Sequence, residues 1–418
     1  MSTTKDYATF AAALQDTAVI GDPWLGGAER FRLAPVRLDA ATYREVTAAA
    51  AGIALVHDEV ASLVARTPEL LASHFGLTPW QRGMWQCAAP AWHGIARADV
   101  FLTATGAKVC ELNSDTPSGQ AEAVLANALK APEHPGCLDP NRALPQRFVA
   151  LVEAMARSIG TRGPLQVGIL YPTEFPEDLS MVAVYRDWLQ RAGHTVTLGS
   201  PFNLGLAHDG RATLFDTPCD VIVRHYKTDW WGERLPVFDD EPPLPDREPL
   251  VAPLLQLLRA SVERRTAVCN PFGAVVTQNK RAMALCWEQI ERFSPDAQAA
   301  IRRWLPRTVR LETVREELWQ QRERWVLKSD YGCEGDEVVV GPHVDQATWE
   351  GALAHAIAAR WVAQEYFEAV PDDHGDLVNH GVYLIGGDPA GVLARVHRAG
   401  ATDHRARIAP VFVMGGAA

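Results

Sequence analysis

Apolar residues recur at helical spacing in the first part of the chain and alternate with polar ones after residue 95. Residues 1–95 are predicted to be mostly helical, with a long helix over Ala41–Arg66. Two alternating runs follow, Arg97–Ala104 and Lys108–Ser114, and the Gly106 segment between them predicts a hairpin. The pattern therefore predicts helices packed against a strand pair, followed by a helix over Gln120–Lys130.

The middle of the chain changes to compact apolar runs. Strands are expected over Leu165–Tyr171, His194–Leu198 and Cys219–His225, with a helix over Met181–Ala192 after the first. This order is typical of a small α/β unit with a parallel component. A surface loop over Trp230–Arg247 and a helix over Leu250–Arg265 complete the region.

The last part, from about residue 270, alternates between helices and strands. The expected elements are a helix over Lys280–Ile290, strands over Arg324–Lys328 and Glu337–Gly341, a helix over Gln346–Arg360, a strand over Trp361–Phe367 and a hairpin of Gly381–Gly386 with Gly391–His397.

Composition and charge narrow the functional classes. The 418 residues carry a formal net charge of −11, so no basic surplus is present to bind nucleic acid. The longest apolar run covers about ten residues, whereas a membrane span needs about 20. The seven cysteines are odd in number and include no CxxC pair, which supports neither disulfides nor a zinc site. We expect a cytoplasmic protein with no membrane segment and no nucleic-acid partner.

The hairpin after residue 95 carries candidate metal ligands. With a turn centred on Gly106, Asp99 is expected opposite Asn113, and Phe101 opposite Glu111. Side chains alternate between the faces of a strand, so Arg97, Asp99, Glu111, Asn113 and Asp115 share one face. Carboxylate and amide oxygens suit a hard cation such as Mg²⁺. The alternative is a solvated hairpin face with incidental charges.

A lysine and a glycine loop follow much later in the chain. Lys328 ends an apolar strand, and Gly332 and Gly335 come directly after it, so their backbone N–H groups are candidates for binding phosphate. Lys280 stands at the start of a predicted helix, and Gln364-Glu365-Tyr366 ends an apolar strand that fits an adenine-binding hinge. Each feature alone is typical of ordinary surface residues, so their order along the chain is the stronger signal.

Together these motifs resemble the circularly permuted branch of the ATP-grasp fold, similar to the synthetase domain of glutathionylspermidine synthase and its relatives. The Arg97-x-Asp99 pair, the Glu111-x-Asn113-x-Asp115-Thr-Pro run and Asn279-Lys280 carry the likeness, which covers about residues 30–415. The expected fold class is α/β (α+β), a permuted ATP-grasp core with an α/β pre-ATP-grasp-like unit.

The resemblance implies residue roles and two cofactors, ATP and Mg²⁺. Asp99, Glu111 and Asn113 are expected to bind magnesium, and Arg97 to act at the transferring phosphoryl group. The expected ATP-binding residues are Lys280 and Lys328 on the phosphates, Gly332 and Gly335 in a closing loop, and Gln364, Glu365 and Tyr366 around adenine. We expect no amidase domain like that of the bifunctional enzyme, so amide hydrolysis is not implied.

We expect three parts: residues 1–150 with the N-terminal helices and metal hairpin, 160–270 with the α/β unit, and 271–418 with the nucleotide-binding lysines, loop and hinge. Arg224 and Lys227 after the Cys219–His225 strand, and Arg395 on the last hairpin, are candidates for substrate binding. For the segment that carries Arg224 and Lys227, a loop packed by two tryptophans is the alternative.

The implied activity is an ATP-dependent carboxylate–amine ligase, which forms an amide from a small acid and a small amine through an acyl phosphate. A non-catalytic ATP-binding protein with the same fold is the alternative. A Rossmann-like transferase ranks last, because no GxGxxG follows the Leu165 strand. The two substrates and the oligomeric state are not fixed by the sequence.

Overall fold

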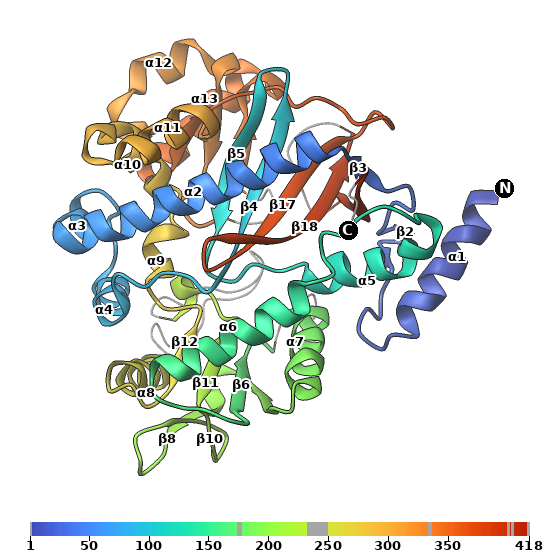
Figure 1. The fold of residues 1–418 in the computed structure, drawn as a ribbon. Coiled ribbons are helices and arrows are strands. Elements are labelled where there is room, and N and C mark those ends of the chain that lie inside the picture. Colours follow the sequence, from blue (N-terminus) through green and yellow to red (C-terminus); the bar gives the residue numbers. More distant parts are fainter. Residues whose placement is uncertain are drawn as a thin grey trace.

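The structure is a computed structural model, and it describes residues 2–173, 178–231, 250–332, 337–398, 402 and 405–415. Helices and strands alternate along most of this length, as Figure 1 shows. The predicted mixed α/β class is confirmed.

An antiparallel sheet with the order β19-β18-β17-β4-β5 lies at the centre. Its strands come from two segments that are far apart in the sequence, and these segments meet where β17 pairs with β4. They are β4 (Ile95–Thr103), β5 (Gly106–Asn113), β17 (Leu377–Ile385), β18 (Asp388–His397) and β19 (Arg407–Ala409). The predicted final hairpin is therefore present with longer strands, and it completes the sheet begun by the first hairpin (Figure 1).

The register of the first hairpin differs from the prediction. Asp99 lies opposite Glu111 and Arg97 opposite Asn113, whereas we expected Asp99 opposite Asn113 and Phe101 opposite Glu111. Thr103 pairs directly with Gly106, which has a φ of +114°, and the register shifts by one residue between Asp99 and Val100. Because of the tighter turn and this irregularity, Asp99 pairs with a residue two positions earlier on β5 than predicted. Because side chains alternate, Arg97, Asp99, Glu111 and Asn113 still share one face, whereas Asp115 lies beyond the end of β5.

Helix α2 (Ala40–Arg66) covers the other face of the central sheet (Figure 1). Asp39 caps it by accepting a hydrogen bond from the Thr42 backbone N–H. Its buried residues join a core with Val100, Val109 and Leu112 of the sheet. In the described part of the chain α2 alone is long and apolar enough to cross a membrane, and 56% of its most apolar window is buried in the protein. It reads as a core helix.

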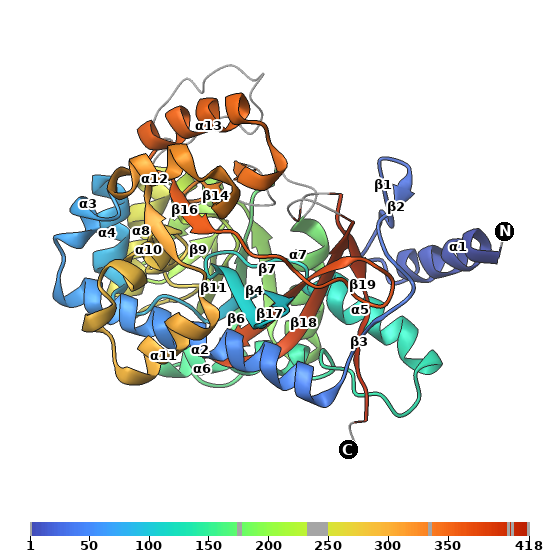
Figure 2. The same ribbon diagram turned by 90° about the horizontal axis from the view of Figure 1, so that it is seen from above.

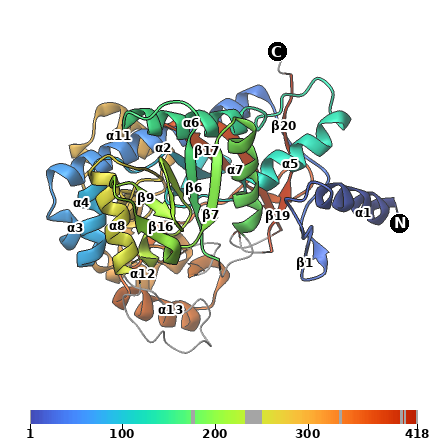
Figure 3. The same cartoon turned by 90° about the horizontal axis from the view of Figure 1, so that it is seen from below.

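A second sheet, of parallel strands, forms the α/β unit (Figure 3). Its order is β12-β11-β6-β7, with β6 (Gln166–Leu170), β7 (Thr195–Gly199), β11 (Val221–Arg224) and β12 (Ala267–Cys269). Three helices accompany it, α6 (Leu144–Ser158), α7 (Leu179–Arg191) and α8 (Val251–Val262), with short strands β8 (Leu204–Leu206), β9 (Ala212–Leu214) and β10 (Thr217–Pro218). The predicted parallel component is confirmed. β12 was not predicted, because three residues give no readable period.

A third, antiparallel sheet has the order β13-β16-β14-β15, with β13 (Thr308–Arg310), β14 (Trp325–Lys328), β15 (Val338–Val340) and β16 (Val362–Glu365). Helices α12 (Arg315–Gln320) and α13 (Gln346–Ala358) lie by it (Figure 2). Trp325, Leu327 and Ala363 face a core that includes Trp349 and Leu353 of α13. The opposite face, with Lys328 and Gln364, therefore points toward the body of the protein.

Shorter elements join these sheets. They are α1 (Ser2–Gln15), β1 (Trp24–Leu25), β2 (Ala28–Glu29), β3 (Val36–Leu38), α3 (Leu70–Ser73), α4 (Pro79–Ala88), α5 (Gln120–Lys130), α9 (Ala274–Thr277), α10 (Arg281–Glu288), α11 (Pro295–Trp304) and β20 (Val411–Val413). Most of the expected Trp230–Arg247 loop lies outside the described residues, although Trp231 at its start is fully buried. The three-part division of the chain stays a prediction.

Candidate functional site

The face of the central sheet turned away from α2 carries charged and amide side chains. Arg97 and Asp99 of β4 stand beside Glu111 and Asn113 of β5, as the cross-strand pairs place them. Arg97 and Asp99 are 7% and 3% exposed, so these charges are largely removed from water. The structure thus brings together the predicted catalytic arginine and the three predicted metal ligands.

Asp99 is held by two arginines. Arg97 donates from Nε to Asp99 Oδ1 at 2.9 Å, and Arg395 of β18 donates from Nη2 to Oδ2 at 2.6 Å. Asn113 Nδ2 also approaches Oδ2, at 3.4 Å. Burial alone would raise the pKa of Asp99, but the charges of Arg97 and Arg395 lower it to about 2. Asp99 is therefore a carboxylate at neutral pH.

Arg97 also reaches the loop before α5. Its Nη1 donates to the Ser118 carbonyl at 3.0 Å, and the Tyr383 hydroxyl donates to the same oxygen at 2.9 Å. The side chain passes over Gly381 of β17, where an added Cβ would lie 2.8 Å from Arg97 Cδ. Arg97 thus has a fixed position, which a residue that stabilises charge in a transition state needs.

Lys280 and Lys328 converge on strand β5 from two different elements. Lys280, directly before α10, places Nζ 3.3 Å from Glu111 Oε1 and donates to the Gly332 carbonyl at 2.6 Å. Lys328 at the end of β14 donates to the Cys110 carbonyl at 3.1 Å. Both ammonium groups therefore lie beside adjacent residues of the strand that carries Glu111 and Asn113.

The three residues of the expected adenine hinge do not share one direction. Gln364 is buried, and its Oε1 accepts a hydrogen bond from Lys328 Nζ at 2.7 Å. Glu365 points to the other face of the sheet and pairs with Arg324 at 3.6 Å. Tyr366 follows the strand, and its ring contacts His343. Gln364 thus belongs to the lysine side of the site, and any adenine contact by Glu365 would come from its backbone.

The predicted glycine loop is only partly described. Gly332 contributes the carbonyl that Lys280 binds. Gly335 lies outside the described residues.

Asn379 of β17 was missed by the sequence analysis. It lies opposite Arg395 in the strand register, is 2% exposed and hydrogen-bonds to Asp99. Its Oδ1, together with Arg395 Nε and Glu111 Oε1, is buried without a hydrogen-bond partner in the described residues. The predicted strand began at Gly381, so Asn379 lay outside it, and its place beside Asp99 depends on the pairing of β17 with β4, which the sequence pattern does not show.

The substrate role predicted for Arg224 does not fit the geometry. Its side chain is fully buried, and Nη2 pairs with Asp115 at 2.5 Å. Nε and Nη1 donate to the Asn270 and Tyr226 carbonyls. Asp115 accepts further hydrogen bonds from the Thr228 backbone and hydroxyl. Arg224 and Asp115 therefore join the α/β unit to the segment that follows the first hairpin, and neither presents an open group to a substrate.

Lys227 remains a candidate for substrate binding. It is partly exposed, follows β11 at the carboxyl end of the parallel sheet, and places Nζ 4.9 Å from the centre of the Trp230 ring. The adjacent Asp229 has its pKa raised to about 6 by burial, with Lys227 opposing that shift. The carboxyl end of this sheet thus carries titratable groups beside the hairpin.

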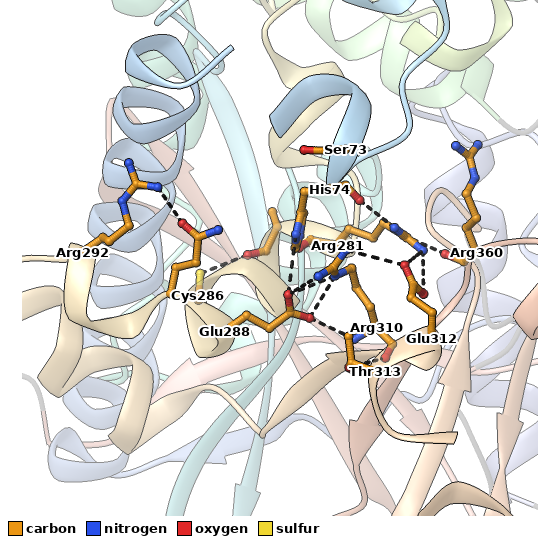
Figure 4. Close-up of polar contacts among 12 residues, drawn as sticks. Ser73, His74, Arg281, Cys286, Glu288, Arg292, Arg310, Glu312, Thr313 and Arg360 are labelled. Carbon is orange, nitrogen blue, oxygen red and sulfur yellow. Dashed lines mark hydrogen bonds and ion pairs between the residues drawn. The ribbon is translucent and has the colours of Figure 1, made fainter. Parts of the chain in front are cut away.

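An ion network around the buried Arg281 anchors the helix that follows Lys280 (Figure 4). Arg281 binds Glu312 through both carboxylate oxygens at 2.9 and 3.0 Å and donates to the His74 and Arg360 carbonyls. Arg310 binds Glu288 at the other end of α10. These contacts fix α10 to β13 and to the end of α3, so they also hold in place the backbone of Lys280, which directly precedes α10.

The residues on this face fit a magnesium ion. Glu111 Oε1 is a buried carboxylate oxygen with no hydrogen-bond partner among the described residues, and Asp99 is ionised on the neighbouring strand. Asn113 adds an amide oxygen, the donor type that hard cations accept. The described residues contain no cluster of three or more histidine, cysteine, aspartate or glutamate side chains placed to hold a metal, so the fit relies on two carboxylates and one amide.

Comparison with solved structures concerns the fold. The apo structure of a glutathione synthetase-like effector from Globodera pallida aligns with 98% of this chain and 96% of its own, with a TM-score of 0.60 and 11% identity. This likeness shows a shared fold. A putative gamma-glutamylcysteine synthetase from Methylobacillus flagellatus KT covers 90% of this chain and 87% of its own at 15% identity, but its TM-score of 0.46 is too low to support an argument.

No curated protein matches the chain. The sequence profile of one family, described as glutathionylspermidine synthase pre-ATP-grasp, matches residues 35–414. The match spans most of the chain, includes every residue placed in the site above, and confirms the resemblance drawn from the Glu111-x-Asn113-x-Asp115-Thr-Pro run. The chain belongs to the glutathionylspermidine synthase pre-ATP-grasp family.

Proposed function

We propose that this protein is an ATP-dependent carboxylate–amine ligase, which forms an amide from a small acid and a small amine through an acyl phosphate. One observation carries the proposal: Lys280 Nζ lies 3.3 Å from Glu111 Oε1, and Lys328 Nζ lies 3.1 Å from the carbonyl of the preceding residue, Cys110. Two cations from distant segments thus face the strand that carries the magnesium candidates. This is the charge pattern that a nucleotide triphosphate with its metal requires.

The lysines are suited to bind phosphate oxygens. An ammonium group has three N–H donors, and Lys328 uses two of them on the Cys110 carbonyl and on Gln364. The third is available to a nucleotide phosphate. Lys280 donates to Gly332, so it also links the phosphate site to the glycine loop.

Magnesium would be held by Asp99, Glu111 and Asn113. When bound, the ion neutralises charge on the phosphates and orients the transferring group. Arg97 and Arg395 flank Asp99 and place two guanidinium groups at the same point. Their planar donors suit the carboxylate of the acid substrate and the oxygens of the transferring phosphoryl group.

The proposed chemistry has two steps. A carboxylate oxygen of the acid attacks the γ-phosphorus of ATP, ADP leaves, and an acyl phosphate forms. The amine then attacks the carbonyl carbon, inorganic phosphate leaves, and the amine nitrogen loses a proton. Arg97 stabilises the negative charge in both steps because its guanidinium is fixed by Asp99 and Ser118. We place this reaction in the cytoplasm.

Calorimetric titration tests the nucleotide part of the proposal. Wild-type protein is titrated with a non-hydrolysable ATP analogue with and without Mg²⁺, beside the double variant Asp99→Asn, Glu111→Gln. We expect magnesium-dependent binding that the double variant loses. The matched control is Asp187→Asn, Glu263→Gln, which removes two exposed carboxylates of surface ion pairs and is expected to bind as wild type does.

Product release tests the ligase part. Acid–amine pairs are screened for ADP and phosphate release that requires both substrates together. Nucleotide binding without turnover for any pair would favour the alternative, a non-catalytic ATP-binding protein. Absence of nucleotide binding under all conditions would contradict both the ligase and the non-catalytic ATP-binding protein.

A further inference from the structure

A buried hydrogen-bond chain runs from β13 to the nucleotide lysine. Thr308, the first residue of β13, is fully buried and lies opposite Gln364 in the strand register. Its hydroxyl donates to the Pro306 carbonyl at 3.0 Å, so its oxygen can accept a bond from another group. Gln364 Nε2 donates to that oxygen at 3.1 Å. Thr308 therefore fixes one end of the Gln364 amide.

The other end of the amide meets Lys328. Lys328 Nζ donates to Gln364 Oε1 at 2.7 Å, and an ammonium group can only donate. The amide must therefore present its oxygen to Lys328 and its nitrogen to Thr308. Both contacts require the same amide orientation. Each group in the series Lys328, Gln364, Thr308 therefore donates to the next, and Thr308 donates to the Pro306 carbonyl.

We propose that Thr308 is a positioning residue for nucleotide binding: through the Gln364 amide it holds the Lys328 ammonium at the phosphate site. The inference rests on the proposed function, since it assigns Lys328 to the ATP phosphates. Thr308 has no contact with that site itself, because Gln364 and Lys328 stand between.

The positioning matters because lysine has a long flexible side chain. Four rotatable bonds must be ordered before the ammonium can bind a phosphate, and an anchored lysine has already lost that freedom. The described contacts anchor Lys328 Nζ at two points, Gln364 and the Cys110 carbonyl. Loss of the Thr308 hydroxyl leaves the Gln364 amide nitrogen with only the weak contact to Met283 Sδ at 3.7 Å, so the amide oxygen that Lys328 binds is no longer held in a fixed position.

The test compares Thr308→Val with Thr308→Ser. Valine keeps the shape of threonine and removes the hydroxyl, whereas serine keeps the hydroxyl. We expect Thr308→Val to weaken Mg²⁺-dependent binding of the ATP analogue roughly tenfold, the usual effect of one charge-assisted hydrogen bond, and Thr308→Ser to bind within about twofold of wild type. In turnover assays the loss is expected in the KM for ATP and not in kcat.

The matched control is Thr266→Val. Thr266 is also fully buried, donates to the Cys219 carbonyl at 2.8 Å and accepts from the Ala212 backbone at 2.9 Å, at the amino end of β12. This variant loses a comparable buried hydroxyl far from Lys328. We expect it to lose stability as Thr308→Val does and to keep its ATP affinity. Equal ATP affinity in Thr308→Val and wild type, or equal losses in Thr308→Val and Thr266→Val, would overturn the proposal.

A second readout is independent of ATP. Lysine acylation by a small amine-reactive reagent is quantified at Lys328 by peptide mass spectrometry in the intact, folded protein. We expect Thr308→Val to raise the Lys328 rate severalfold and to leave the rate at exposed lysines unchanged. If wild type fails to bind ATP while this rate still rises, the proposed function fails and the relay to Lys328 stands; an unchanged rate overturns the relay itself.

Discussion

The two faces of the central sheet have opposite characters although they share the same strands. The face under α2 is apolar and includes Val100, Val109 and Leu112. The other face carries Asp99 and Glu111, with Arg97, Asn379 and Arg395 beside them. Neighbouring residues of one strand therefore belong to different environments.

This difference suggests that the apolar face contributes to stability, whereas the polar face serves function. Burial of aliphatic side chains under α2 favours folding by about 25 cal/mol per Å² of apolar surface. On the polar face, Asn379 Oδ1 and Arg395 Nε are buried without hydrogen-bond partners in the described part of the chain, and Glu111 Oε1 has only the ion pair with Lys280 at 3.3 Å. Such groups cost free energy unless a ligand completes them. We infer that the polar face is arranged for a bound ion and substrate at a cost to stability.

The largest expected effect comes from Glu111→Gln. The variant removes the charge beside Lys280 and one of the proposed magnesium ligands, so we expect about a 1,000-fold loss of kcat/KM for ADP release, comparable to removal of a transition-state contact. Glutamine keeps an oxygen that can accept a hydrogen bond from the buried Lys280, so the free energy of unfolding should change by only about 1 kcal/mol. Urea unfolding and the coupled ADP assay measure the two quantities. A large loss of stability would show that Glu111 has mainly a structural role.

Leu112→Ala probes the next residue of the same strand on the other face. Leu112 is 3% exposed within the α2 core, so the cavity is expected to lower the free energy of unfolding by about 3 kcal/mol. ATP affinity, measured at a temperature where the variant is folded, should stay within about threefold of wild type. An affinity loss as large as that of Glu111→Gln would break the separation of the two faces.

Lowering the pH should reduce the free energy of unfolding through His57 of α2, which is buried on the apolar side of the central sheet. Burial lowers the pKa of His57 to about 4, with its bond to the Ile53 carbonyl opposing the shift. The unfolded chain then binds more protons than the folded one between about pH 6.5 and pH 4, so stability falls as the pH drops through this window. His57 should account for about 2 kcal/mol of the stability lost from pH 7 to pH 5, so we expect this loss to be about 2 kcal/mol smaller in His57→Leu. Burial also lowers the pKa values of His93 and His380 to about 4, and their contributions should remain in the variant. Chemical unfolding at both pH values measures it; an equal loss in both proteins would contradict the assignment.

The smallest expected effect comes from Gly381→Ala, on the polar face. The new Cβ would lie 2.8 Å from Arg97 Cδ and 3.2 Å from Nε, so Arg97 must move. We expect about a tenfold loss of kcat/KM with little change in stability, because displacement of a positioned group costs rate. Gly83→Ala is the control: Gly83 lies in α4 with nothing within 4 Å of an added Cβ, and its activity should match wild type.

Several features followed from local pattern alone. The two-residue alternation around Gly106 placed Arg97, Asp99, Glu111 and Asn113 on one face, and this survived a register error because a shift of two residues preserves the face. Helical spacing predicted α2 nearly to the residue, and α5 with both of its ends. These properties depend on neighbours in sequence, so the sequence by itself determined them.

Tertiary structure decided the rest. Nothing near Arg224 indicates that Asp115, more than a hundred residues earlier, would bind its guanidinium and exclude it from substrate. Thr308 and Asn379 look like ordinary strand residues until β13 and β17 set them beside Gln364 and Asp99. Local preferences determine which residues share a face, whereas a hydrogen-bond partner is chosen by the packing of elements that are distant in the chain.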